Sequence, residues 1–133
     1  MSDTETKQPP RGDLVAAADG FADEIAMRAA EIEANRFLPH DIARRFAEAG
    51  LYRLCVPEAY GGREAHPGEL VKVVERLARA DGSAAWCVFI GATSGLVAGF
   101  LDPAEARAVF ADPLTITAGV FAPRGKAVRT GEG

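Results

Sequence analysis

The 133-residue sequence has no strongly basic segment and no excess of positive charge. Fifteen Lys and Arg residues against 19 Asp and Glu residues give a formal net charge of −4, and no basic run is longer than Arg44-Arg45. Nucleic-acid surfaces need clustered positive charge, so this balance argues against a nucleic-acid partner, and the acidic character also argues against a membrane surface. The sequence is 48% apolar and 26% charged, which is typical of one soluble globular domain with a single core.

Cysteine and histidine are too sparse to predict a disulfide framework or a metal centre. Cys55 and Cys87 lie in apolar stretches without a C-x-x-C pattern, which is typical of small buried residues in a reducing compartment. His40 and His66 stand apart, without the clustered ligands that a metal needs. We therefore expect no metal site, and no residue of the chain is predicted to be catalytic.

Two further absences concern targeting and nucleotide binding. Residues 1–12 have no apolar stretch that could serve as a signal peptide, and they contain Pro9-Pro10, so we expect a mobile tail on a cytoplasmic protein. No G-x-G-x-x-G follows a strand-like segment, and no G-x-x-x-x-G-K-S/T motif is present. Any cofactor must be bound by another device.

Apolar residues at helical spacing predict a helical region over residues 13–112. The pattern favours helices from 13 to about 35, from Pro39 until Gly50 supplies a left-handed stop, and from Pro67 to about 80. Asp102-Pro103 with Glu105 indicates the start of a short helix ending near Ala111, because an acidic N-cap, a first-position proline and a following glutamate occur together.

The segment from Ser83 to Leu101 contains no charged residue and repeats glycine at positions 91, 95 and 99. This pattern resembles a membrane helix with a close-packing face. The segment is short and only weakly apolar, and it lacks basic flanks, so we favour a central helix buried on all sides. The glycine row then lets another backbone or a planar ligand approach the helix.

The pattern changes after Asp112-Pro113, where strand-like sequence begins. Residues 114–121 (LTITAGVF) are β-branched and small, residues 123–126 indicate a turn, and residues 127–130 are predicted as a partner strand. A lone hairpin is marginally stable, so the sequence looks unfinished at Gly133. Residues 113–133 are therefore predicted to begin an incomplete β domain.

Several motifs in order resemble the amino-terminal helical domain of the acyl-CoA dehydrogenase family. They are Leu38-Pro39, residues 46–51 (FAEAGL), residues 56–62 (VPEAYGG) and residues 73–83 (VVERLARADGS). Residues 82–86 (GSAAW) and 119–125 (GVFAPRG) are more similar to one branch, the reduced-flavin monooxygenases. The resemblance covers residues 14–133, about the first third of a typical member.

The resemblance implies a subunit with a helical domain, a middle β domain and a carboxy-terminal bundle, assembled as a homotetramer through the bundle. The flavin, FAD or alternatively FMN, lies between the last two parts. The positions that match the flavin-binding residues are Trp86, Gly119, Val120 and Phe121. Thr93 and Ser94 are expected to line the substrate cavity. Phenol-hydroxylating members have a histidine where this sequence has Ser94, so proton transfer with a phenol is not expected at this position.

The first function that the resemblance implies is acyl-CoA α,β-dehydrogenation by hydride transfer to flavin. The alternative is an oxygen-dependent monooxygenase that uses reduced flavin from a flavin reductase and acts on an aromatic or polycyclic compound. A hypothesis of another class is a non-catalytic helical module that binds a partner through the glycine-lined helix or an open strand edge. In the enzyme hypotheses, the 133-residue chain alone is predicted to be inactive.

Overall fold

The computed structural model describes residues 13–120, 122 and 124–131, and in these ranges it contains five α-helices and no strand. The helices are α1 (Asp13–Asn35), α2 (His40–Glu48), α3 (Pro67–Ala78), α4 (Gly82–Ser94) and α5 (Pro103–Val109). Three 3-10 turns accompany them: η1 (Leu51–Arg53), η2 (Glu58–Tyr60) and η3 (Gly95–Phe100). The prediction of a mainly helical domain is confirmed.

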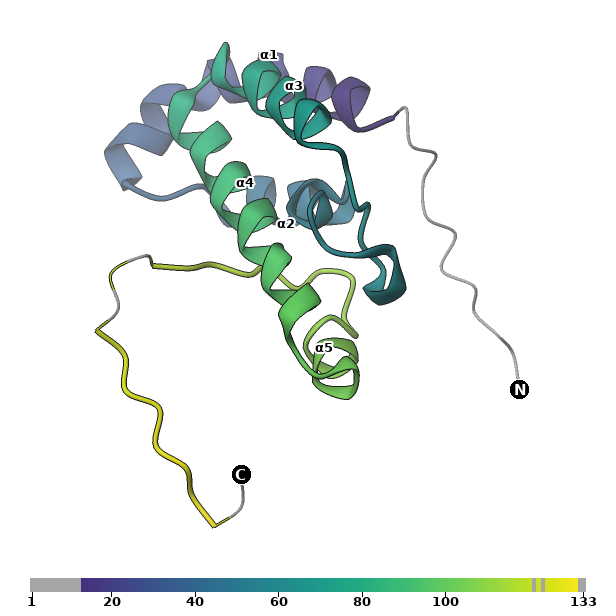
Figure 1. The fold of residues 1–133 in the computed structure, drawn as a ribbon. Coiled ribbons are helices and arrows are strands. Elements are labelled where there is room, and N and C mark those ends of the chain that lie inside the picture. The colour runs from purple at the N-terminus through teal and green to yellow at the C-terminus, as the bar shows by residue number, and fades with distance from the viewer. Residues whose placement is uncertain (1–12, 121, 123, 132–133) are drawn as a thin grey trace.

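Helices α1 and α3 pack side by side, and α4 packs on α3 and leads toward α5 (Figure 1). One face of each helix supplies the core, as the apolar spacing predicts. Phe46 of α2 is fully buried at its centre, with its ring 4.8 Å from that of Phe21 and 6.3 Å from that of Tyr52. The other fully buried large side chains are Leu14, Ile25, Ile42, Leu51, Leu54, Val56, Val73, Leu77 and Val88.

The ends of the helices follow local sequence signals. Gly50 has a φ of +80° directly after α2, as the predicted left-handed stop requires. At the start of α5 the Asp102 carboxylate accepts a hydrogen bond of 2.9 Å from the Ala104 N–H, and Pro103 occupies the first turn. His66 caps α3, because its Nδ1 accepts a hydrogen bond from the Gly68 N–H at 3.1 Å.

The prediction of one helix over residues 83–101, buried on all sides, is wrong in two respects. Helix α4 ends at Ser94 and continues as the tighter η3, and the outer face of both is exposed. Trp86 is 62% exposed and Phe100 is 89% exposed. Gly82–Phe100 is long and apolar enough for a membrane span, with a mean hydropathy of 1.5, but core helices of soluble proteins also meet this criterion.

Two of the three glycines in this segment permit close packing, as predicted. A Cβ atom at Gly91 would overlap the ring of Tyr52, and one at Gly95 would overlap the side chain of Val56. A Cβ atom at Gly99 would lie in open space. The glycine row therefore accommodates residues 52–56, the connector between α2 and α3.

A buried arginine joins this connector to the end of α5. The Arg53 guanidinium donates hydrogen bonds to the carbonyl oxygens of Phe110 at 2.8 Å and Asp112 at 2.6 Å. It also donates to the carbonyl oxygens of Tyr60 at 3.1 Å and Gly61 at 3.3 Å. Burial lowers the pKa of Arg53, while the Asp112 carboxylate opposes that shift. These hydrogen bonds fix the position at which the backbone leaves the helical region after α5.

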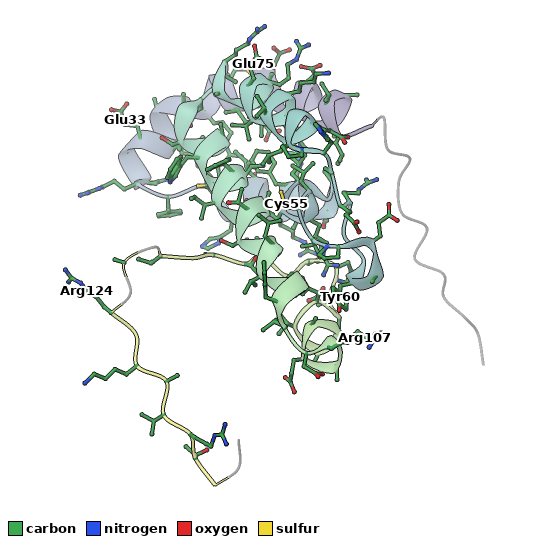
Figure 2. The ribbon with its side chains drawn as sticks, in the orientation of Figure 1. Glu33, Cys55, Tyr60, Glu75, Arg107 and Arg124 are labelled. Carbon is green, nitrogen blue, oxygen red and sulfur yellow. The ribbon has the colours of Figure 1, made fainter. Side chains whose placement is uncertain are left out.

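The predicted strands at 114–121 and 127–130 are absent from the described residues. Residues 115–120 run beside α4 without forming a strand, and residues 124–130 lead away from the helices, as Arg124 shows in Figure 2. Strand-like sequence needs a neighbouring edge to form a ladder, and the described part of the chain offers none. Phe121 and the predicted tail at 1–12 lie outside the described residues. The domain boundary near 112 stays a prediction.

Candidate functional site

An uncharged groove of about 330 Å³ lies between α4 and residues 113–120, which we call the exit segment. Helix α4 forms one wall, the exit segment forms another, and the connector and the start of α2 close the groove. Its lining residues are Leu38, Ala43, Tyr52, Trp86, Cys87, Ile90, Gly91, Ile116, Thr117 and Ala118. Mostly apolar lining with a few polar groups is typical of a small-molecule site.

Trp86 stands at the rim of this groove. Its side chain is 62% exposed, and its ring lies 5.7 Å from that of Phe89, with 35° between the ring planes. The Phe89 ring supports one side of the indole and leaves the rest open to a ligand. An exposed tryptophan presents a large apolar surface together with one N–H donor.

Tyr52 forms the buried wall of the groove, and the absence of a side chain at Gly91 makes room for its ring. Only 4% of Tyr52 is exposed. Burial raises the pKa of Tyr52 above its ordinary value, and a smaller electrostatic contribution from Cys87 acts in the same direction. The phenol is therefore neutral at physiological pH and keeps its proton for donation.

The exit segment is held in place at two points. Arg53 binds the carbonyl oxygens of Phe110 and Asp112, directly before the segment begins. Further along, the Thr117 hydroxyl donates a hydrogen bond of 3.2 Å to the carbonyl oxygen of Gly91 on α4. These contacts span 57 and 26 residues of sequence, and together they bring the exit segment against α4.

The structure brings some of the predicted site residues together. Gly119 lies beside Ser94, since a Cβ atom at Gly119 would lie 3.2 Å from the Ser94 hydroxyl oxygen. Ser94 is half-buried and stands next to the groove rather than in its wall. Trp86 lines the groove, as a ligand-binding role requires.

Other predicted site residues lie apart from the groove. The Thr93 hydroxyl donates to the Phe89 carbonyl oxygen at 2.7 Å within α4, and Thr93 is not part of the groove wall. Val120 is 86% exposed beyond the groove. Phe121 lies outside the described residues. The flavin and substrate roles assigned to all of these positions stay predictions.

A second hollow, of about 590 Å³, lies on the other side of Trp86, where α1 ends and α4 begins. Leu38, Trp86 and Cys87 line both hollows. The second hollow is more polar, since its remaining wall consists of Ile32, Glu33, Arg36, Phe37, Gly82 and Ser83. Trp86 therefore separates an uncharged groove from a hollow that contains charged side chains.

Sequence reasoning missed Tyr52, Ile116 and Thr117 as groove residues. Tyr52 belongs to an apolar connector, and Thr117 belongs to a predicted strand, so neither pattern indicates a binding wall. The glycine at position 91 was the available signal, because it predicted close approach to the helix. The identity of the approaching side chain depends on contacts between distant parts of the chain.

The groove wall fits the flat, apolar part of a flavin or of an aromatic substrate. It contains no charged side chain, and the exit segment brings an extended backbone with Gly119 toward α4. Burial raises the pKa of the Cys87 thiol, with a further contribution from Asp81, so the sulfur is a protonated thiol at neutral pH. The described groove residues supply no cation for a phosphate group.

Metal ligands do not gather in the described part of the chain. No group of three or more His, Cys, Asp or Glu side chains stands close enough there to share an ion. His66 acts as a helix cap, and His40 lies beside the Phe37 ring, with 5.8 Å between ring centres.

The helical fold places an uncharged groove beside α4, at the border between the helices and the exit segment. Residues 13–103 match the model of the acyl-CoA dehydrogenase N-terminal domain. The chain belongs to the acyl-CoA dehydrogenase family, as the sequence motifs predicted.

Named relatives point to one branch of this family. The chain is 31% identical to an indole-3-acetate monooxygenase of Pseudomonas putida over 87% of its own length and 30% of that protein. It is 30% identical to a pigment production hydroxylase of Rhodococcus erythropolis, over 86% of the chain and 30% of that protein. It is 29% identical to the oxygenase subunit HsaA of a flavin-dependent monooxygenase of Mycobacterium tuberculosis, over 94% of the chain and 32% of that protein. The chain thus spans about a third of these relatives' length.

Proposed function

We propose that the chain forms the helical domain of a reduced-flavin, oxygen-dependent monooxygenase that acts on an aromatic compound. The uncharged groove rimmed by Trp86 is the observation that carries this proposal, because its wall suits a flat apolar molecule. The relatives named as monooxygenases and a hydroxylase support oxygenation. They favour this activity over the acyl-CoA dehydrogenation that was expected first.

Reduced flavin, when bound, supplies the two electrons of the reaction. One atom of O₂ then enters the substrate, and the other leaves as water. The contribution of this chain is to bind and to exclude water. Trp86 and Ile90 cover an aromatic ring from the α4 side, and Ile116 and Ala118 cover it from the exit segment. The apolar wall lowers the local water content and so protects a reactive site from side reactions.

The proposal includes a partner and an assembly. A separate flavin reductase supplies reduced FAD or FMN, as the resemblance to the reduced-flavin monooxygenase branch implies. Copies of the enzyme form a homo-oligomer, as the family resemblance implies, and the protein acts in the cytoplasm. The oxygenase relative from Mycobacterium tuberculosis is itself named as a subunit, which is consistent with a two-component system.

The test uses the complete gene product with reduced FAD or FMN, molecular oxygen and indole-3-acetate or a phenol. Incorporation of one labelled atom from ¹⁸O₂ into the product supports the proposal. Reduction of bound oxidised flavin by an acyl-CoA, without oxygen consumption, overturns it in favour of dehydrogenation.

A variant pair assigns the activity to the groove. Trp86→Ala removes the rim, so we expect weaker substrate binding and more reducing equivalents lost to hydrogen peroxide. Phe100→Ala is the matched control, because Phe100 is also aromatic and exposed but lies on η3, outside the groove. If substrate binding and hydrogen peroxide release are the same in both variants, the groove has no role in the reaction.

A further inference from the structure

Tyr52 is the polar group in the groove wall whose bonding is incomplete. Only 4% of the surface of Tyr52 is exposed. Within the described residues no hydrogen bond is formed by its hydroxyl, and this hydroxyl is not among the side-chain atoms that are buried without a partner, so it keeps access to solvent in a residue that lines the groove. A hydroxyl that donates to water in an otherwise apolar wall can donate to the acceptor atom of a ligand once that water is displaced.

The ring of Tyr52 is held by packing, so its hydroxyl keeps one position at the groove. Gly91 leaves just enough space for the ring edge, and the ring of Phe46 lies 6.3 Å away on the core side. A donor held by packing on both sides is pre-organised, and a ligand that accepts from it loses little conformational entropy.

The other polar groups of the groove are less suited to bind a ligand. The Thr117 hydroxyl already donates to the carbonyl oxygen of Gly91. Cys87 carries a protonated thiol, which is a weak donor. The remaining groove side chains are apolar, apart from the indole N–H of Trp86 at the rim. Tyr52 is therefore the strong donor inside the groove.

We propose that Tyr52 is a substrate-binding residue that donates a hydrogen bond to one acceptor atom of a flat aromatic ligand in the groove between α4 and the exit segment. The ligand class is an uncharged bicyclic or similar aromatic compound with one ring nitrogen or oxygen substituent at its inner end. A groove of about 330 Å³ accommodates such a molecule. The assignment of this ligand as the substrate rests on the proposed monooxygenase function, but the hydrogen bond does not.

The test compares two nearly isosteric probes, quinoline and naphthalene, which differ in one ring nitrogen that accepts a hydrogen bond. Trp86 is the one tryptophan of the 133-residue sequence, and its indole N–H signal at the groove rim is assigned by its loss in Trp86→Phe. Titrations with ¹⁵N-labelled complete gene product yield a dissociation constant for each probe without any enzymatic turnover. The variants are Tyr52→Phe, which retains the packed ring, and Tyr60→Phe as the control.

We expect the wild-type protein to bind quinoline about threefold to tenfold more tightly than naphthalene, because a neutral hydrogen bond contributes that much to affinity. Tyr52→Phe should abolish this preference and leave naphthalene binding unchanged, while Tyr60→Phe should retain the preference. Tyr60 lies beside Arg107 of α5 and does not line the groove (Figure 2).

Three results would overturn the assignment. They are no shift of the Trp86 signal with either probe, no quinoline preference in the wild type, and a preference that survives in Tyr52→Phe. An equal loss of both probes in Tyr52→Phe would show that the variant damages packing, and this also counts against a donor role. If the protein fails to oxygenate a substrate but still shows the Tyr52-dependent preference for quinoline, only the monooxygenase proposal is rejected.

Discussion

The two faces of α4 and η3 differ in the size of their side chains and in what covers them. The inner face carries small buried residues, Ala84, Ala85, Val88 and Ala92, and glycines that meet the connector. The outer face carries large side chains that remain exposed, Trp86, Leu96, Val97 and Phe100. Small residues let helices and connector approach closely, whereas exposed large apolar residues mark a surface available for binding.

This difference separates stability from function along one segment. The inner face joins a core that is closed by Phe46, Val73 and Leu77, all fully buried. The outer face borders the groove, where the exit segment is attached through Thr117 and through the Arg53 bonds before it. Substitutions on the inner side should change the free energy of unfolding, and those of outer residues that line the groove, such as Trp86, should change ligand binding.

The largest effect should come from a matched pair of phenylalanines. Phe46→Ala empties a fully buried site and should lower the free energy of unfolding by about 3–5 kcal/mol. Phe100→Ala, at 89% exposure on the outer face, should change it by less than about 0.5 kcal/mol. Urea unfolding followed by circular dichroism measures both. Similar losses in the two variants would contradict the distinction between the faces.

The next effect concerns the arginine that joins the connector to the exit segment. Arg53→Met leaves carbonyl oxygens of Phe110 and Asp112 without their buried donor, so we expect a loss of about 2–4 kcal/mol. Amide hydrogen exchange should also become faster at residues 112–117, because the second attachment point, Thr117, then acts alone. Arg44→Met, at an exposed position on α2, is the control and should leave this exchange unchanged.

The parts of this fold that follow local rules were predictable from the sequence. Apolar spacing located α1, α2 and α3, and Gly50 and Asp102 marked a helix end and a helix start as expected. These signals lie within a few residues of the structure they specify. The break between α4 and η3 has no comparable signal, because the segment from Ser83 to Leu101 is uncharged throughout and contains no proline.

The groove was harder to predict, because its walls come from distant parts of the sequence. Trp86 was found through the family motif, but Tyr52 and Thr117 reach the site through tertiary contacts. Strand-like residues 114–120 failed to form a strand because β-structure depends on a pairing partner, whereas a helix satisfies its own backbone. Local pattern indicates what a segment prefers, and long-range packing decides what it contacts.

A third, smaller effect compares two glycines in the same row. Gly91→Ala places a methyl group against the Tyr52 ring, and overpacking of this kind should lower the free energy of unfolding by about 1–3 kcal/mol. Gly99→Ala has open space and should be neutral or stabilising by up to about 1 kcal/mol. Thermal unfolding of both variants checks this. A neutral Gly91→Ala would mean that Tyr52 moves freely, which would also weaken its role as a fixed donor.

The smallest effect lies at the outer rim of the core, where Arg28 joins α1 to α2. Its guanidinium donates to Asp41 at 2.6 Å and to Glu31 at 2.8 Å, and these hydrogen bonds lower the pKa values of both carboxyl groups. Groups whose pKa is lowered in the folded state stabilise it above their unfolded pKa values, 3.8 for Asp41 and 4.5 for Glu31. That contribution is lost as the pH falls through the lowered folded values.

Arg28→Ala should therefore weaken the pH dependence of stability below about pH 4.5, while differing little from the wild type at the acidic limit. The effect should be small and should decrease with added salt, because water and ions screen an exposed cluster. Urea unfolding from about pH 7 to about pH 3, with Arg36→Ala as an exposed control without an ion pair in the described residues, measures the difference. An unchanged pH profile in Arg28→Ala would show that this rim, unlike the buried face of α4, contributes nothing to holding the helices together.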